Sequence, residues 1–569
     1  MNFLNNGTGY KLFAEAALCD TYVDKTMMID TLYRYVCAGN KYICVTRPRR
    51  FGKSVNANMI AAFFDKSTGE ESRELFQQLA LGMLQPEQDK CFAANPRGTE
   101  ERKLCWPRQG ILNVIRINMI DVLFDTVQSF AALHSKLAFL LREDLQHQYP
   151  DLTFSEEKDL PELLMQTGES FVFVIDEWDA FFETPSVTES DKQQYLLFLK
   201  GLLKDKPYVH LVYMTGILPI AKYTSGSPLN MFHEFSAFQD DQFYSYFGFT
   251  REEIQDLMQR KGYTQPSLEE LILWYDGYVR SNDGVHMFNP ASVSRALVDK
   301  KCRSYWTGTG PMNEVRDIIH HNVHDLREDV IRMVGGESLS IRLSGFSVEK
   351  DKVSSKDEIL SAMVVYGFLS YFDGHLCIPN HELMLKFQSA LTSEELGLKQ
   401  TLDASKRLLN ATLEQRDREV AALIEELHTE KIPFFNYNDE NSLACVVTIG
   451  YLAALDDYRI TREDKAGKGY ADFTFEPKMH REIPIILELK YNRSVKYALK
   501  CIKEKGYIHR FRDYPKVLLV GINYSEKTKK HTCKTEQVCP LDILPKENEA
   551  EHFLPGSRPG HMPNKGSMD

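Results

Sequence analysis

The chain has 569 residues, enough for roughly two to four domains, and its hydrophobic content of 43% is normal for globular domains. A net charge of -12 excludes a surface that is basic throughout, so nucleic acid would have to bind in a local basic groove. No apolar run reaches about 18 residues, so we expect no membrane-spanning helix and no membrane partner.

The cysteines and the start of the chain bear on its compartment. The 11 cysteines are scattered and include no CxxC pair, which is typical of free thiols in a reducing compartment. Residues 1–20 lack the charged and long apolar regions of a secretory signal. We therefore expect an intracellular protein, with cytoplasm and nucleus both open.

Short apolar segments alternate with helical ones in the first part of the chain. We expect strands at 41–46, 111–120, 170–176 and 210–216, and helices at 54–66 and 130–145. Strands separated by helices predict a parallel sheet with helices on both faces.

The rest of the chain divides by composition. Residues 84–110 are polar and rich in Pro and Gly, which predicts an inserted surface loop. Residues 250–335 follow a helical pattern, and 397–428 predict one or two long amphipathic helices. A second compact region is expected at about 430–525, and the end of the chain, poor in large apolar groups, predicts disorder.

The stretch TRPRRFGKSVN, residues 46–56, lies between an expected strand and an expected helix and contains Gly52, Lys53 and Ser54. A phosphate loop needs a tight turn whose N–H groups face the phosphates. It also needs a lysine that reaches the terminal phosphates and a hydroxyl that binds Mg²⁺. These three residues supply those groups. The alternative is a basic turn capped by Ser54.

A second acidic motif follows in FVFVIDEWD, where an apolar strand ends in Asp176 and Glu177. Asp176 is placed to hold Mg²⁺ through water, and Glu177 to orient and polarise the attacking water. The alternative is an acidic helix start, since carboxylates suit that position electrostatically. The next strand ends in Thr215, which is placed either to sense the terminal phosphate or to begin a turn.

Arg47 occupies the position where a phosphate loop usually has its first glycine. Arginine does not adopt a glycine-only backbone angle cheaply, so the first turn of this loop must differ from the common form. We expect Arg47, Arg49 and Arg50 to add charge near the phosphates. The alternative is that one of them pairs with an acidic neighbour instead.

Several motifs in order are similar to the AAA-ATPase-like family of P-loop proteins. The resemblance covers about residues 10–335, implies an ASCE-type P-loop fold that uses ATP and Mg²⁺, and says little about substrate. An arginine at position 47 is usual in this family, whereas Trp178 stands where it usually has Tyr. The motifs are YVDKT, TRPRRFGKS, VIDEWDA, TGI, YFGFTREEI, WYDGY and FNPASV.

A separate constellation occurs in GKGYADFTFEP (467–477) and IPIILELKYN (483–492). Asp472 lies on one expected strand, and Glu488 and Lys490 share a face of the next because side chains alternate along a strand. Two carboxylates and a lysine can bind one or two Mg²⁺ ions that activate a water. Glu440 is a candidate third carboxylate. The alternative is a strand with polar residues on its solvent face.

These residues resemble the PD-(D/E)XK nuclease superfamily over about 430–525. The resemblance implies that Asp472, Glu488 and Lys490 are the metal and catalytic residues, with Glu440 as a helper and Mg²⁺ or Mn²⁺ as the metal. Two positions depart from the family pattern: Tyr470 replaces a frequent Arg, and Cys501 replaces a frequent Gln. Neither departure removes a metal ligand, but a cysteine at 501 weakens a contact to substrate or water.

The resulting expectation is an α/β protein with a P-loop NTPase sheet flanked by helices, a helical region, and a smaller α/β PD-(D/E)XK nuclease-like domain. We expect an ATPase coupled to a metal-dependent nuclease that cleaves DNA or RNA; the alternative is a nucleotide-dependent regulatory switch. The sequence leaves open whether the chain forms a homo-oligomer. The expected boundaries are 10–240 for the P-loop domain, 241–335 for its helical lid, 336–429 for a helical connector, 430–528 for the nuclease-like domain and 529–569 for a disordered tail.

Basic side chains near the second constellation are candidates for contact with nucleic acid, with two tyrosines between them. A solvated helix face is the alternative for most of them. They are Lys496, Lys500, Lys503, Lys505, Arg510 and Arg512, with Tyr497 and Tyr507.

Overall fold

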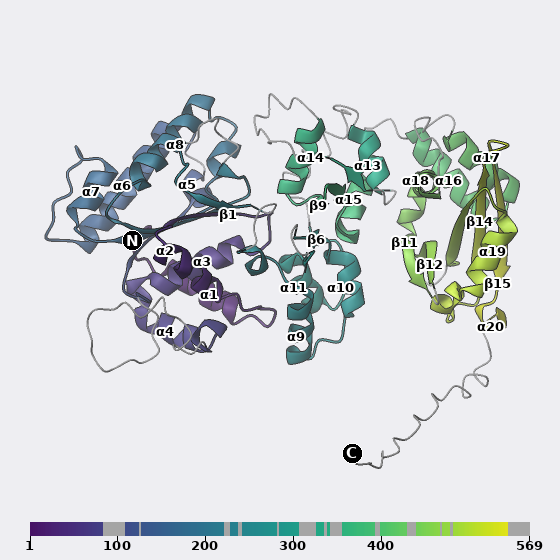
Figure 1. The fold of residues 1–569 in the computed structure, drawn as a ribbon, viewed down its shortest axis with the longest axis horizontal. Helices are drawn as coiled ribbons and strands as arrows, with labels where there is room; N and C mark the ends of the chain where they lie inside the picture. Colours follow the sequence, from purple (N-terminus) through teal and green to yellow (C-terminus); the bar gives the residue numbers. More distant parts are fainter. Residues whose placement is uncertain are drawn as a thin grey trace, which may run out of the picture. The chain divides into compact units, whose positions relative to one another are not determined.

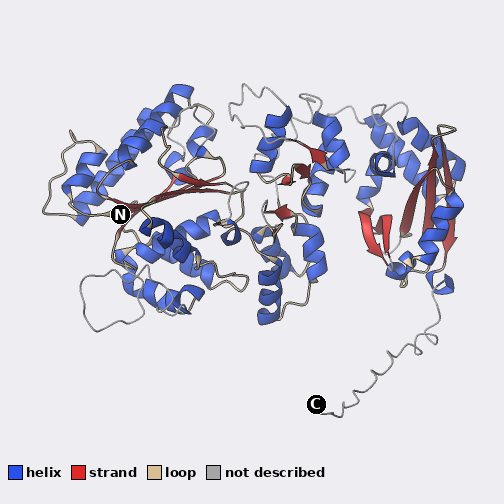
Figure 2. Cartoon of the chain, in the orientation of Figure 1, coloured by secondary structure: helices blue, strands red, loops and turns tan. Residues whose placement is uncertain are grey.

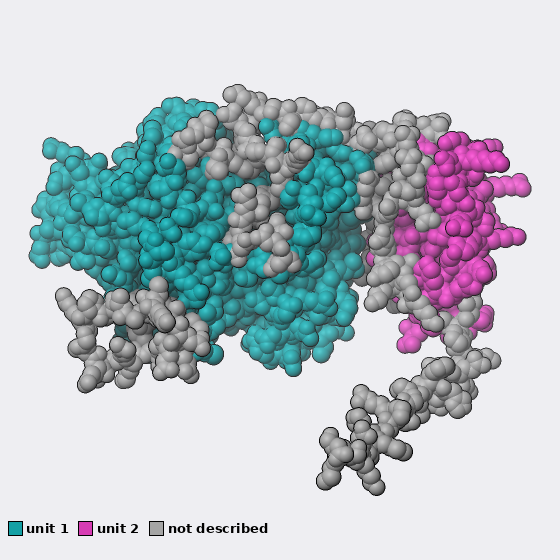
Figure 3. All heavy atoms as spheres, viewed as in Figure 1, with its two compact units in different colours: residues 1–333, 338–390 teal, residues 334–337, 391–569 magenta. Residues whose placement is uncertain are grey.

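The chain folds into two compact units, coloured separately in Figure 3: unit 1 (1–333 and 338–390) and unit 2 (334–337 and 391–569). Each unit is considered by itself. The structure, a computed structural model, describes residues 1–83, 108–124, 127–220, 228–236, 242–280, 284–306, 326–334, 338–341, 356–392, 399–428, 440–466, 469–477 and 482–543. Most of the expected surface loop at 84–110 lies outside these residues.

Unit 1 is built on a parallel sheet in the strand order β2-β3-β4-β1-β5. The four strands expected from the sequence are confirmed with small shifts at their ends. The fifth was missed because β5 has only three residues, of which one is buried. The strands are β1 (Tyr42–Thr46), β2 (Asn113–Asn118), β3 (Phe171–Asp176), β4 (Val209–Gly216) and β5 (His233–Phe235).

Helices cover both faces of this sheet, as the alternating pattern predicts (Figures 1 and 2). One face packs α6 (Phe130–Gln148), α7 (Leu160–Gln166) and α8 (Glu189–Leu203) into a continuous apolar core. The other face carries α1 (Thr8–Ala17), α2 (Met28–Cys37), α3 (Lys53–Phe64) and α4 (Gly69–Gln77), and the short α5 (Met119–Leu123) follows β2. Burial on both faces explains why β1 and β3 read as uninterrupted apolar runs.

A helical region follows, as expected. It contains α9 (Arg251–Lys261), α10 (Leu268–Tyr275) and α11 (Pro290–Asp299), with a small hairpin of β6 (Tyr278–Val279) and β7 (His286–Met287). Thr250 and Glu253 close a capping box at the start of α9, which is the start that the sequence indicates.

The predicted helical connector at 336–429 is not one element. Its first part belongs to unit 1 and contains β8 (Leu339–Ser340), α14 (Lys356–Val365), β9 (Ser370–Phe372), β10 (His375–Cys377) and α15 (His381–Thr392), after α13 (Leu326–Val334). The three strands form a sheet in the order β8-β10-β9. The sequence did not predict these strands, because strands of two or three residues are too short to interrupt a helical pattern visibly.

Unit 2 contains a mixed sheet in the order β11-β12-β13-β14-β15, in which only β13 and β14 run parallel. Its helix α19 packs on β13 and β14, and α17 packs on β15, so the second part of the predicted connector belongs here. The elements are α16 (Lys399–Leu413), α17 (Asp417–Glu426), α18 (Glu440–Gly450), β11 (Tyr458–Ala466), β12 (Gly469–Pro477), β13 (Ile485–Tyr491), α19 (Val495–Glu504), β14 (Val517–Ser525), β15 (Lys530–Val538) and α20 (Pro540–Ile543).

The predicted start of the disordered tail, at residue 529, is too early in the sequence. Residues 530–538 form β15, which pairs with β14 along its whole length. The strand buries His531 and Thr535 but exposes Lys530, Thr532 and Lys534, so its composition reads as polar although its pattern is that of a strand. Residues 544–569 lie outside the described part.

A buried carboxylate fixes the turn that follows β3. Asp179 is 2% exposed, and its Oδ2 accepts hydrogen bonds from the N–H groups of Ile217 (2.9 Å) and Leu218 (2.6 Å), just after β4. A Cβ at Gly216 would lie 2.3 Å from Asp179 Oδ1, so only glycine fits there. Burial, followed by the charge of Glu177, raises the pKa of Asp179 to about 7.

We expect Asp179 to make stability depend on pH. Its pKa in the folded chain lies above the value of about 4 for an unfolded Asp, so folding takes up a proton. Its contribution is therefore complete below about pH 4 and is lost as the pH rises through about 7. Asp179→Asn keeps an uncharged acceptor. It should raise the melting temperature at pH 8 and flatten its dependence on pH, measured by circular dichroism between pH 5 and 8.

Asp151→Asn is the matched control, because Asp151 is exposed. Its melting profile should parallel that of the wild type. A profile for Asp179→Asn that also runs parallel to the wild type would show that Asp179 carries no such dependence.

Candidate functional site

The loop after β1 has the backbone form of a phosphate loop. Gly52 immediately precedes α3 with φ of 88°, and Arg50 also lies in the left-handed region with φ of 70°. An added Cβ at Gly52 would meet no atom within 4 Å, so the backbone angle itself, and not a clash, favours glycine. The loop thus turns directly into the N-terminus of α3, where free N–H groups favour an anion.

Sheet register brings the predicted side chains together. Thr215 lies opposite both Val45 and Asp176, so β4 places it between the ends of β1 and β3. Lys53 Nζ lies 3.8 Å from Glu177 Oε1 and donates to the carbonyl of Pro48 at 3.2 Å. The strand order β3-β4-β1 therefore converts three motifs far apart in sequence into one cluster.

Asp176 is the buried centre of this cluster. Burial raises its pKa, and a hydrogen bond from Ser54 opposes that effect. Its Oδ1 accepts the N–H of Glu177 at 3.1 Å. Its Oδ2 and the Oγ1 of Thr215 are buried without a hydrogen-bond partner among the described residues. A buried carboxylate oxygen beside a serine hydroxyl is suited to Mg²⁺, directly or through water, so the residues fit the metal that the motif implies.

The backbone conformation of Glu177 is energetically unfavourable. Its φ of 51° is in the left-handed region, which a residue with a side chain adopts only when its surroundings impose it. Three hydrogen bonds impose this conformation here. The N–H of Trp178 donates to the carbonyl of Thr215 (3.1 Å), and Asp179 accepts the two hydrogen bonds from the backbone after β4. The turn aims the Glu177 carboxylate towards Lys53.

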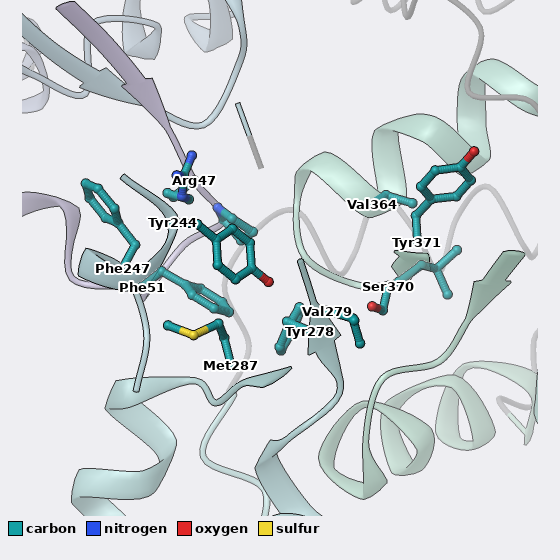
Figure 4. A pocket seen from close by; sticks show the side chains of 12 residues that line it. Arg47, Phe51, Tyr244, Phe247, Tyr278, Val279, Met287, Val364, Ser370 and Tyr371 are labelled. Atoms are coloured by element: carbon teal, nitrogen blue, oxygen red, sulfur yellow. The ribbon is translucent and has the colours of Figure 1, made fainter. Parts of the chain in front are cut away.

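The three arginines point in different directions. Arg47 is buried, and its guanidinium donates to the carbonyls of Thr46 (2.7 Å) and Phe235 (2.9 Å). Figure 4 shows it beside Tyr244 and Phe247 at a cavity of about 40 Å³, and its guanidinium lies 4.9 Å from the centre of the Phe247 ring. These contacts fit a structural anchor better than a phosphate contact.

Arg49 and Arg50 border the loop instead. Arg49 pairs with Glu183 at 3.1 Å, which is the acidic-neighbour alternative. Arg50 donates to the carbonyl of Tyr305 at 2.7 Å, and burial lowers its pKa. Both residues, with Gly52, Lys53 and Ser54, line a larger pocket of about 530 Å³.

Three other segments of unit 1 complete this larger pocket. Tyr22 and Val23 come from the segment before α2, Phe249 from the segment before α9, and Pro290 and Ala291 from the first turn of α11. Sequence reasoning quoted these stretches as family motifs and did not assign them to a site. The pocket therefore joins a polar phosphate-loop end to an apolar and aromatic end.

In unit 2, the second constellation meets on one face of the sheet. Glu488 and Lys490 share the face of Ile486, which packs against Leu499 and Ile502 of α19. On the neighbouring strand, Asp472 Oδ2 accepts the N–H of Leu489 at 2.6 Å. The predicted convergence on β12 and β13 is thus present in the structure, at strand centres and not at a strand start.

The charges of this cluster are close together. Lys490 Nζ lies 3.1 Å from Glu488 Oε1 and 4.0 Å from Asp472 Oδ2. Glu488 is 2% exposed; burial, then the charge of Asp472, raises its pKa, and Lys490 opposes the shift. Its Oε2 has no hydrogen-bond partner within the described ranges. An unpartnered buried carboxylate oxygen next to a second carboxylate fits a divalent cation.

The third predicted ligand is not placed. Glu440 is the first residue of α18, and its side chain lies outside the described part of the structure. Over the side chains that are described, no group of three or more His, Cys, Asp or Glu residues could hold a metal. The described part of the cluster therefore holds two carboxylates.

Most of the predicted nucleic-acid residues pair with acids. Lys500 meets Glu504, Lys503 meets Glu536, Arg510 meets Glu476 and Arg512 meets Asp513, which favours the solvated-face alternative for these four. Lys496 and Tyr497 are exposed. Tyr507 is buried, and Lys505 reaches Glu488 at 3.9 Å. Lys505 therefore belongs to the cluster, an assignment that the sequence pattern did not make.

A search of the described helices found none that is both long and apolar enough to cross a membrane.

Comparison with known proteins gives separate results for the two units. Residues 12–224 match the family model described as predicted AAA-ATPase, and residues 438–534 match that of the PD-(D/E)XK nuclease superfamily. No curated protein matches the chain.

Two solved structures resemble the chain at low identity. The Walker-type ATPase of Pyrococcus abyssi is 12% identical with a TM-score of 0.31, covering 64% of this chain and 95% of its own. The Aeropyrum pernix ORC2 protein, in ADPNP-ADP complexes, is 9% identical with a TM-score of 0.30, covering 64% and 92%.

The chain carries an AAA-ATPase-like domain, followed in sequence by a domain of the PD-(D/E)XK nuclease superfamily.

Proposed function

We propose that unit 1 binds and hydrolyses ATP and that unit 2 cleaves nucleic-acid phosphodiesters. The observation that supports it most is that each unit places a lysine and a second carboxylate beside a buried carboxylate, one oxygen of which has no described hydrogen-bond partner. The proposed domain limits are 10–240 for the P-loop domain and 241–390 for the helical parts of unit 1. The nuclease-like unit runs from 391 to 543.

In unit 1, the N-terminus of α3 and Lys53 would bind the β- and γ-phosphates, and Arg49 and Arg50 would border them. Ser54 and Asp176 would hold Mg²⁺, which when bound neutralises phosphate charge. Glu177 would orient a water for attack, and Thr215 would contact the terminal phosphate or that water. The aromatic end of the pocket, with Tyr22 and Phe249, would take the base.

Lys53→Ala should weaken ATP binding. A charge-assisted contact contributes about 1.5–3 kcal/mol, so affinity should fall roughly ten- to a hundredfold. Isothermal titration with ATP and Mg²⁺ measures this. Lys11→Ala, which removes an exposed lysine of α1, should bind as the wild type does. Equal affinity of Lys53→Ala and wild type would refute the phosphate-loop assignment.

In unit 2, Asp472 and Glu488, with Glu440 as a candidate helper, would hold Mg²⁺ or Mn²⁺, which when bound activates a water and stabilises charge on the phosphate. Lys490 would position that water, since its amine lies between the two carboxylates. Glu488 is buried on the sheet at 2% exposure, which restricts the movement of its carboxylate. We infer the substrate class from the proposed metal ligands and the lysine, a set that suits a phosphodiester of DNA or RNA.

Glu488→Gln should strongly reduce cleavage. Loss of a metal-binding charge removes several kcal/mol of transition-state stabilisation, so the rate should fall on the order of a hundredfold or more. Labelled single- and double-stranded DNA and RNA, with Mg²⁺ or Mn²⁺, are the substrates. Glu476→Gln, on the same strand β12 as Asp472 but paired with Arg510, is the control and should cleave normally. Undiminished cleavage by Glu488→Gln would remove the assignment.

A regulatory switch is the second candidate function. Cys501 favours it, because a buried thiol replaces the polar side chain usual in the resembling family and weakens contacts to substrate or water. In that case ATP would change assembly or partner binding without cleavage. Light scattering with and without ATP distinguishes the two, since a size that changes with nucleotide while all substrates stay intact supports the switch.

A further inference from the structure

A second lysine reaches the buried carboxylate of the nuclease-like site. Lys490 Nζ lies 3.1 Å and Lys505 Nζ 3.9 Å from the same oxygen, Glu488 Oε1. Lys490 comes from β13, whereas Lys505 is the residue that caps the C-terminus of α19. The site therefore has two cations from two elements, where the strand motif supplies only one.

The two lysines differ in their access to solvent. The side chain of Lys490 is 12% exposed and is enclosed between Asp472 and Glu488, but that of Lys505 is 45% exposed. A polynucleotide phosphate approaches from solvent and carries a full negative charge. Of these two ammonium groups, Lys505 is the one that it can reach without rearrangement of the strand.

The side chain of Lys505 is supported on both sides. Its amine lies 5.5 Å from the centre of the ring of Tyr507, which is fully buried. The Lys505 amine donates a hydrogen bond to the Tyr507 hydroxyl, and this bond, with the charge of Glu488, raises the pKa of Lys505. The carboxyl end of α19 adds a favourable helix dipole. A long flexible side chain is thereby held at the mouth of the site.

Cys501 gives this position its significance. It lies four residues before Lys505, on the same face of the helix, and is buried. Its thiol is a weak hydrogen-bond partner at the point where the resembling family often has glutamine. The polar group that α19 offers to the site is therefore found one turn later.

We propose that Lys505 binds a phosphate oxygen of the nucleic-acid substrate at the Asp472–Glu488–Lys490 site, and so supplies from the end of α19 the polar contact that Cys501 lacks. The inference rests on the proposed nuclease-like function of unit 2. It makes Lys505 a substrate-binding residue, unlike Lys500 and Lys503 of α19, which pair with exposed carboxylates away from the site. The competing explanation is that Lys505 only neutralises Glu488 and touches no substrate.

The test measures binding separately from cleavage. The full-length protein and its Lys505→Met variant are titrated with fluorescein-labelled single- and double-stranded DNA and RNA, first in EDTA and then in Ca²⁺, and anisotropy is followed over a series of salt concentrations. We expect about tenfold weaker binding by Lys505→Met at low salt. The slope of log affinity against log salt should fall by about 0.7–0.9, as for the loss of one phosphate contact.

Two further variants sharpen the result. Lys505→Arg keeps the charge and should retain most of the affinity. Lys500→Met removes the same charge from an exposed position of the same helix and should change affinity by less than about threefold. Circular dichroism melting controls for folding, and Lys505→Gln replaces Lys505→Met if the latter is unstable.

Each outcome decides the inference. Wild-type affinity and salt slope in Lys505→Met would overturn it and leave the neutralising role. Equal losses in Lys505→Met and Lys500→Met would also overturn it, because the effect would then be one of general charge. If the wild-type protein binds nucleic acid but cleaves none of the substrates with Mg²⁺ or Mn²⁺, the nuclease function alone is overturned. If the wild-type protein binds no nucleic acid, both the nuclease function and the role of Lys505 are overturned.

Discussion

The site of unit 1 depends on one constraint, the parallel register of β3, β4 and β1. Carboxyl ends of adjacent parallel strands lie at the same edge of a sheet, so Asp176, Thr215 and the phosphate loop meet without any long connection between them. The register alone does not aim the side chains. The buried Asp179 does so, because its carboxylate joins the turn after β3 to the backbone after β4 and holds Glu177 in an unfavourable conformation.

Unit 2 solves a different electrostatic problem. Burial of Glu488 costs free energy that pairing must offset, and Lys490 at 3.1 Å is the nearer of the two lysines that pair with it. The strands supply the charges at fixed spacing, while α19 covers the same face and brings Lys505 to it. A sheet of mixed direction permits this, since the parallel pair β13–β14 requires a crossover, and that crossover is the helix that completes the site.

Sequence reasoning predicted what is local or periodic. The strands ending in Thr46, Asp176 and Gly216 and the capped start of α9 follow from patterns within about ten residues, and the Asp472–Glu488–Lys490 set follows from two short motifs on consecutive strands. Contacts between distant segments could not be predicted. Arg47 read as a phosphate ligand because its sequence position is beside the loop, yet its guanidinium turns to the carbonyl of Phe235 on β5.

The short strands and the last strand, β15, could not be predicted from the sequence for a related reason. β8, β9 and β10 have too few residues for alternation to be visible, and β15 carries polar side chains on its exposed face, which lowers its apparent hydrophobicity. The sequence indicates Lys505 only as one of several basic residues that could contact nucleic acid. Its distinction, proximity to Glu488, is a property of how α19 ends over the sheet.

The phosphate loop is also joined to residues 338–390 by buried polar contacts. Arg50 donates to the carbonyl of Tyr305, and the N–H groups of Tyr305 and Trp306 donate to Glu382 Oε1 at 2.5 and 2.6 Å. Glu382 also accepts from Ser292 of α11, whose first turn lines the large pocket. A buried carboxylate with three donors loses free energy if any of them withdraws, so the loop, α11 and α15 cannot shift independently.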